Sequence, residues 1–84
     1  MNRTVINRQA NKKLKELYLS KDITRCEMCG GSWGLSFAHR KKRRFYQTLE
    51  DLSDFNETLL LCYTCHNRIE YDKQLTEDTF NKLR

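Results

Sequence analysis

Four cysteines in two Cys-x-x-Cys pairs are the residues of this sequence with the clearest chemistry. A two-residue spacer lets both thiolates of a pair point at one ion, and two pairs complete the tetrahedral sulfur shell that zinc prefers. Such a closed shell leaves no position for water, so the ion should hold the fold together rather than catalyse. The predicted ligands of this structural Zn²⁺ are Cys26, Cys29, Cys62 and Cys65.

Disulfide bonds are the competing interpretation of these cysteines. The polar residues 1–13 contain no apolar stretch that could act as a secretory signal, and no run approaches the roughly 20 apolar residues of a membrane span. We therefore expect a soluble, cytoplasmic chain without membrane contact, whose thiols stay reduced. A disulfide within either pair would indicate a redox enzyme, and the sequence pattern around such a motif is missing.

Both histidines of the sequence lie close to this predicted zinc site. His39 follows a short segment with alternating apolar residues, and His66 directly follows Cys65. An imidazole with the ordinary pKa near 6.5 is largely neutral at pH 7 and can accept a proton from water, as hydrolysis of a phosphodiester requires. A lone histidine is more often structural, but two beside one zinc site favour a shared function.

A run of five cations follows His39 without a gap. Like charges repel one another, so the run should be extended or mobile until it meets an anion. Its position beside His39 favours a clamp for the phosphate backbone of DNA, which would position DNA without reading its sequence. A solvated or nuclear-localisation-like segment is the alternative. The run consists of Arg40, Lys41, Lys42, Arg43 and Arg44.

The elements that must position these residues can be predicted from the sequence around them. The glycines of residues 26–31 allow a tight turn after the first cysteine pair. Short strands are expected over 35–39 and 58–61, joined by a long loop over 40–57, and a helix over 63–71 starts within the second pair. Two zinc knuckles with a hairpin between them form a treble-clef arrangement.

Two further helices are predicted at the ends of the sequence. Residues 4–19 have apolar side chains at steps of three or four, with basic residues between them, which is typical of an amphipathic helix. Thr76 is a plausible N-cap for a last helix that ends near Leu83. The expected apolar stripe of the first helix is Ile6, Ala10, Leu14 and either Leu17 or Tyr18.

Length and composition limit the core and divide the charge. The 84 residues make at most one domain, and their hydrophobic share of 38% is below the usual ~45–50%, so zinc is an expected staple. Residues 1–49 carry 12 basic and 3 acidic side chains, a balance of +9, whereas residues 50–84 carry 4 and 8, a balance of −4. The basic half predicts a polyanionic partner such as nucleic acid.

The strings CEMCGG, LSFAHR and NETLLLCYTCHNRIE resemble the HNH endonucleases of the ββα-metal type, in the subgroup that a four-cysteine zinc braces. Small members of this kind are common in phages and mobile elements, where they act inside a host cell. The resemblance implies one α+β domain over 1–84, with a treble-clef-like, zinc-braced ββα-metal core over 26–71. A basic N-terminal helix within 1–25 and a C-terminal helix within 72–84 would flank this core.

The resemblance implies that the chain is a metal-dependent DNA endonuclease that nicks DNA or cuts both strands. His39 would be the general base, Asn56 the middle residue of the motif, and His66 a ligand of a catalytic Mg²⁺, Mn²⁺ or Ni²⁺. The asparagine would fix the ring and tautomer of His39 by a hydrogen bond. Asn67 is the alternative asparagine. The implied products carry 5′-phosphate and 3′-hydroxyl ends.

Two positions depart from the pattern of the family. Its members usually have Asp or His directly before the general base as a second metal ligand, and this sequence has Ala38 there. Asp54 or Glu70 would then have to supply a carboxylate to the catalytic ion. Asn56 also lies one residue farther from the second cysteine pair than is usual, which puts Glu57 at the expected place.

A function of another class fits the same residues. The chain could be a non-catalytic, zinc-containing DNA-binding module, or an accessory protein to a larger nuclease or packaging complex. His39 would then contact phosphate and His66 would pack beside the zinc. DNA, held mainly through its phosphate backbone, is the expected partner in both cases, and a dimer would suit an enzyme that cuts both strands.

Overall fold

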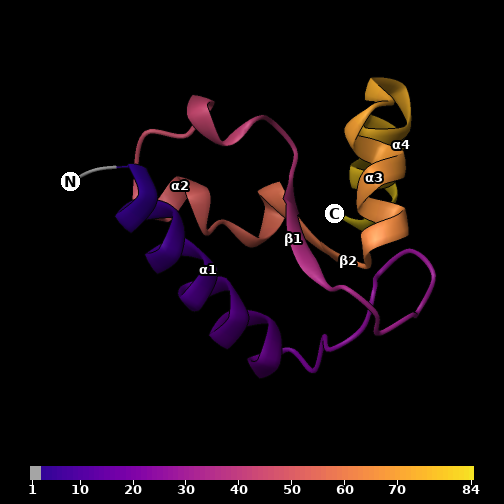
Figure 1. Ribbon diagram of the computed structural model, residues 1–84, viewed down its shortest axis with the longest axis horizontal. Coiled ribbons are helices and arrows are strands. Elements are labelled where there is room, and N and C mark those ends of the chain that lie inside the picture. The colour runs from indigo at the N-terminus through magenta and orange to yellow at the C-terminus, as the bar shows by residue number, and fades with distance from the viewer. Residues whose placement is uncertain (1–2) are drawn as a thin grey trace.

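The computed structural model describes residues 3–84 and shows a small α+β domain (Figure 1). Two short strands form an antiparallel hairpin, with α1 on one side of it and α3 and α4 on the other. No helix within the described residues combines the length and apolar character that a membrane crossing requires. The main elements are α1 (Arg3–Ser20), β1 (Ser36–His39), β2 (Thr58–Leu61), α3 (Tyr63–Glu70) and α4 (Lys73–Leu83).

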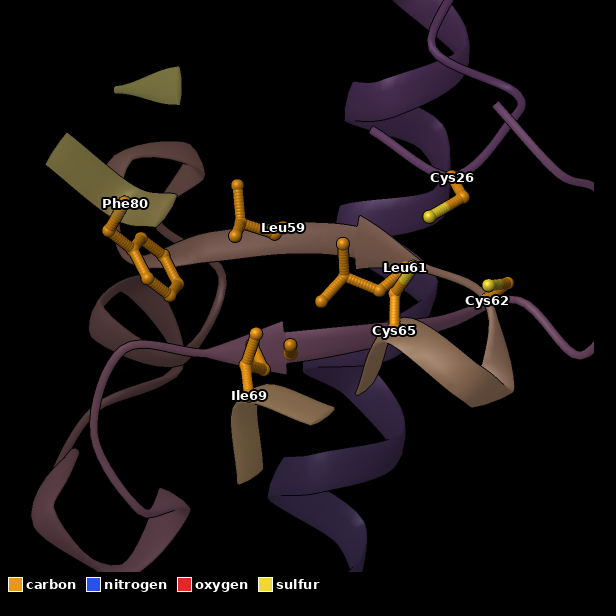
Figure 2. Close-up of a cluster of buried hydrophobic side chains, with 8 residues drawn as sticks. Cys26, Leu59, Leu61, Cys62, Cys65, Ile69 and Phe80 are labelled. Carbon is orange, nitrogen blue, oxygen red and sulfur yellow. The ribbon is translucent and has the colours of Figure 1, made fainter. Parts of the chain in front are cut away.

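Helices cover both faces of the hairpin, and the side chains of each strand point alternately to one face and to the other. Leu59 and Leu61 of β2 belong to a cluster that includes Phe80 of α4 (Figure 2). Leu60, between them, belongs to a second cluster with Tyr18 of α1. All four residues of β2 are buried, and this agrees with its three consecutive leucines, which show no alternation between apolar and polar side chains.

The register of the hairpin determines which face each residue of β1 shares. Ala38 lies opposite Leu59, and His39 lies opposite Thr58. Directly opposed residues point to the same face, so Ala38 points toward α3 and α4. The hydroxyl of Thr58 is hydrogen-bonded to that of Tyr18 in α1 at 2.7 Å. His39 therefore shares the face that α1 covers.

The predicted N-terminal helix and both predicted strands are confirmed. The buried residues of α1 are Ala10, Leu14 and Tyr18, so Tyr18 rather than Leu17 completes the stripe. Leu17 is only partly buried. A spacing of four residues at each step keeps these three side chains on one side of the helix.

The prediction of a long loop over 40–57 missed regular structure, because this segment contains three short helical turns. The side chain of Thr48 caps the second turn by accepting a hydrogen bond from the Asp51 N–H at 3.1 Å. Leu52 at its end is fully buried in a cluster with Ala10 of α1. Contact with α1 stabilises turns too short to show any periodicity. The turns are η1 (Arg43–Phe45), α2 (Leu49–Leu52) and η2 (Phe55–Glu57).

The predicted N-cap of the last helix is also wrong. Helix α4 begins at Lys73, and the side chain of Asp72 caps it by accepting from the Leu75 N–H at 3.0 Å. Thr76 lies inside the helix, where its hydroxyl donates to the Asp72 carbonyl at 2.9 Å. Aspartate is as good an N-cap as threonine or better. The helix therefore begins after Asp72, four residues before the predicted cap Thr76.

Candidate metal centre and histidine site

The first cysteine pair is held in a tight turn before β1. The Cys26 N–H donates to the Gly31 carbonyl at 2.8 Å, and the Gly30 N–H donates to the Cys26 carbonyl at 2.9 Å. Gly30 has a φ of +78°, a conformation that side chains other than glycine rarely adopt. The backbone therefore folds back after Cys29 and presents both sulfurs on one side.

The second pair lies where β2 ends and α3 begins, and there it meets the first pair. Figure 2 shows Cys26 near Cys62 and Cys65. The four Sγ atoms all lie within 4.8 Å of one another, and the Sγ atoms of Cys29 and Cys62 are 3.6 Å apart. Zinc–sulfur bonds of about 2.3 Å in a tetrahedron place sulfurs about 3.8 Å apart. The cluster thus has the size and donor set for a structural ion such as zinc, and no pair of its sulfurs is joined in a disulfide.

The protonation of these thiols favours a cation at their centre. Although burial opposes ionisation, backbone N–H groups lower the pKa of Cys26 to about 6, so this sulfur is a thiolate at neutral pH. Burial raises the pKa of Cys65, and the neighbouring thiols of Cys62 and Cys26 raise it further. A metal ion removes this conflict, because its charge allows four thiolates to occupy the same small volume.

A buried ion pair fastens the first knuckle to the rest of the fold. Glu27, within the first Cys-x-x-Cys, exchanges two hydrogen bonds with the backbone of Leu60: its N–H donates to the carbonyl and its Oε2 accepts from the N–H. Arg84 binds both carboxylate oxygens of Glu27 at 2.9 and 3.0 Å. The guanidinium of Arg84 also lies 3.7 Å from the centre of the Phe55 ring. The free edge of β2 is thereby covered.

His39 is half-buried and is fixed by a backbone carbonyl. Its Nε2 lies 2.7 Å from the carbonyl oxygen of Leu52, and its ring centre is 5.5 Å from that of Tyr46. A carbonyl oxygen can only accept, so the neutral ring carries its proton on Nε2 and keeps Nδ1 as an acceptor. Burial lowers the pKa of His39, and the nearby Arg43 guanidinium lowers it further, although the Leu52 carbonyl opposes this.

His66 occupies the other face of the hairpin. Its N–H donates to the Cys62 carbonyl at 2.9 Å in the first turn of α3, and its Nδ1 lies 2.7 Å from the hydroxyl of Ser36. Ser36 is two residues before Ala38 and therefore shares the face that α3 covers. The two histidines accordingly lie on opposite sides of β1, the strand whose outer edge has no partner among residues 3–84.

The structure places Asn56 on the surface in η2, and its side chain makes no hydrogen bond to the His39 ring. Its N–H donates to Asp54 Oδ1 at 2.9 Å, and its carbonyl accepts from Arg40 at 3.4 Å. The Leu52 carbonyl holds His39 in the way that the resemblance assigned to the asparagine. Asn67 is partly buried in α3.

The acidic residues proposed as extra metal ligands do not gather around His66. Asp54 is exposed and caps η2, and Glu70 is exposed at the end of α3. Ala38 is 2% exposed and packs into the hydrophobic cluster of the hairpin. Within residues 3–84 the four cysteines are the only group of three or more potential ligands that converge. A protein ligand set for a catalytic Mg²⁺, Mn²⁺ or Ni²⁺ is therefore not assembled at His66.

The basic run is divided between one paired residue and four exposed ones. Arg40 forms an ion pair with Glu57 at 3.0 Å and lies over the Phe80 ring. The four cations from Lys41 to Arg44 are exposed, and two of them lie in η1 rather than in extended chain. These four are the cations available to an anion beside His39.

Two residues of the histidine site were not predicted from the sequence. Ser36 could have been found, since a strand residue two positions before Ala38 shares its face. Tyr46, whose hydroxyl accepts from the Lys41 N–H at 3.0 Å and donates to Glu57 at 3.3 Å, could not. Its position depends on contacts between α1 and the helical turns after the basic run.

Comparisons with protein-family models, with curated proteins and with solved structures found no match for this chain. The geometry of the two sites and the charge around them are therefore the grounds on which a function can be assigned.

Proposed function

We propose that this protein is a zinc-braced DNA endonuclease of the ββα type, in which His39 acts as the general base in phosphodiester hydrolysis. The observation that carries the proposal is the state of the His39 ring. It is neutral at pH 7, its Nε2 is bonded to the Leu52 carbonyl, and its Nδ1 is free to accept a proton. The order of β1, β2 and α3 around four clustered cysteines supports the same assignment.

In this proposal His39 removes a proton from the attacking water. The proton moves to Nδ1, and the oxygen of that water forms a bond to phosphorus while the bond from phosphorus to the 3′ oxygen breaks. The leaving oxygen takes a proton from solvent, so the products carry 5′-phosphate and 3′-hydroxyl ends. The Leu52 carbonyl keeps the ring in place throughout and stabilises the imidazolium that forms, because it accepts from Nε2–H in both states.

The exposed cations beside His39 bind the phosphate in this proposal. Arg43 and Arg44 follow β1 in η1 and have no acidic partner within hydrogen-bonding distance among the described residues. Arginine suits phosphate because its planar donors bind two oxygens at once. A divalent ion, if one is bound, would supply further neutralisation of phosphate charge, and His66 Nε2 is the imidazole nitrogen left for it, because Nδ1 is bonded to Ser36.

The test is cleavage of supercoiled plasmid with Mg²⁺, Mn²⁺ or Ni²⁺ added in turn. His39→Ala should reduce the rate by about 10²- to 10⁴-fold, the usual contribution of a general base. Asn56→Ala is the matched control, because its exposed side chain makes no hydrogen bond to His39, and its rate should stay within about threefold of the unmodified protein. Zinc content must be equal in all three proteins. Equal cleavage by the His39 variant would refute the proposal.

A non-catalytic zinc module that binds DNA is the second candidate. The burial of Ala38 and the lack of a converging ligand set at His66 favour it. In that case the cations after β1 would hold the DNA backbone, and the chain would serve as an accessory to a larger nuclease or packaging complex. Plasmid that stays supercoiled with every metal, in a protein that still binds DNA, would select this candidate.

A further inference from the structure

A groove of about 440 Å³ runs between α1 and β1, on the side of the hairpin that His39 occupies. Its floor is apolar and is made by Leu35, Phe37 and Leu60. All three belong to the cluster that α1 covers. The packing of α1 on the hairpin therefore leaves an open channel along one side of the helix.

Cations line this groove on both sides. Lys12 and Lys15 line it from α1, and Arg43 lines it from η1, while no acidic residue contributes to it. Both lysines and Arg43 are exposed. Arg8 lies one turn before Lys12 and on the same side of the helix, since residues four apart are neighbours on a helix surface. Three cations of α1 thus follow one another over about 10 Å of the helix axis.

We propose that this groove binds the sugar–phosphate backbone of duplex DNA next to the bond that His39 is proposed to cleave. The inference rests on the proposed function and specifies how the substrate is held. Phosphates meet the cationic rims, and the apolar floor accepts the face of a deoxyribose. Among the described residues that line the groove, the one hydroxyl belongs to Ser36, which is already bonded to His66, and the one amide belongs to Asn11 at the α1 side. The apolar floor itself therefore has no free polar group to read a ribose 2′-OH.

The groove is continuous with the histidine site at two points. Arg43 belongs both to the groove and to the basic run that follows His39, and its charge lowers the pKa of His39. Ser36 lines the groove and holds His66. A backbone lying in the groove would therefore run along the face of β1 that carries His39, with His66 on the opposite face. Helix α1 becomes a substrate-binding element, in addition to its role in covering the core.

The experiment measures binding of a fluorescein-labelled DNA duplex by anisotropy, over a series of salt concentrations and without added divalent metal. The double variant Lys12→Gln/Lys15→Gln removes two cations from the groove. The matched control is Lys73→Gln/Lys82→Gln, which removes two exposed lysines from α4 on the other side of the hairpin. The slope of log K against log salt is negative, and each lost phosphate contact should reduce its magnitude by about 0.9. We therefore expect the magnitude to decrease by about two for the groove variant and to stay unchanged for the control.

The outcomes separate this inference from the proposed function. If the groove variant has the same slope as the unmodified protein, the groove does not bind the DNA backbone, and the proposed role of His39 is unaffected. If the unmodified protein binds no duplex at all, the proposed function itself is wrong. Tighter binding of single-stranded RNA of the same length would overturn the assignment to duplex DNA. All four lysines are exposed, so equal zinc content in the variants is expected and serves as the check on folding.

Discussion

Two regions of this molecule are built differently, although both depend on the same hairpin. The zinc end consists of the four cysteines and Glu27, and the histidine end consists of the two imidazoles and the basic run after β1. At the zinc end the four sulfurs converge on one another, and Glu27 is bound by Leu60 and Arg84. At the histidine end each ring has one partner and one free nitrogen, and the basic residues from Lys41 onward are exposed. A group that is fully satisfied inside the protein stabilises the fold, whereas a half-satisfied group can still bind a substrate.

The ion pairs of the two ends show the same contrast. The side chains of Arg84 and Glu27 are 5% and 11% exposed, whereas those of Arg40 and Glu57 are 31% and 27% exposed. Water screens the second pair but hardly reaches the first. The two carboxylates are therefore expected to differ in their importance for stability, although each is paired with an arginine at about the same distance.

Among these predictions, removal of the metal should cause the largest loss of stability. Zinc in small peptides binds with about 10–16 kcal/mol, which is as large as the whole free energy of unfolding of a domain of this size, or larger. Cys65→Ser, or a strong chelator added to the unmodified protein, should abolish the cooperative thermal transition seen by circular dichroism. A melt that is unchanged after the loss of bound metal would show that the cysteines do not brace the fold.

The two ion pairs provide the next test. Glu27→Gln leaves the guanidinium of Arg84 buried without a counter-ion and should lower the free energy of unfolding by about 3–5 kcal/mol. Glu57→Gln makes the same chemical change at the half-exposed pair and should cost no more than about 1 kcal/mol. Urea denaturation with zinc present gives both values. If the two variants lose the same free energy of unfolding, the two ion pairs do not differ in their importance for stability.

The smallest effect is expected from the titration of His39. Burial lowers its pKa in the folded protein, so below the ordinary value near 6.5 the unfolded chain binds a proton that the folded chain does not. Stability should therefore fall as the pH drops from 7 through 6.5 toward the lowered pKa, and His39→Gln should remove this part of the pH dependence. Urea denaturation of both proteins at each pH measures the difference. A variant with the same pH dependence would place His39 in a more exposed environment than the structure shows.

The sequence predicted those parts of the fold that depend on local pattern. The buried residues of α1 repeat at a constant spacing, and the four cysteines had only one arrangement that could complete a metal shell. The strand over 58–61 was found in the same residues that form β2, because a short apolar run directly before Cys62 left few alternatives. Each of these predictions needed only residues that are neighbours in the sequence or a repeated motif.

The histidine site could be predicted only in part, because it depends on contacts between distant segments. The sequence placed both histidines beside the zinc, but it did not show that they occupy opposite faces of β1. It also gave no sign that the Leu52 carbonyl would hold His39, since α2 is a single turn that α1 stabilises from outside. The pairing of Arg84 with Glu27 joins residues that are 57 positions apart, and no local pattern predicts it.

The contact of Arg84 with Glu27 has a consequence for the order in which the chain folds. The four cysteines lie within residues 26–65, so the sulfur cluster can form without any residue of α4. As long as α4 is undocked, however, the carboxylate of Glu27 lacks its counter-ion. Metal binding and completion of the core are therefore separable steps, and the second requires the last helix.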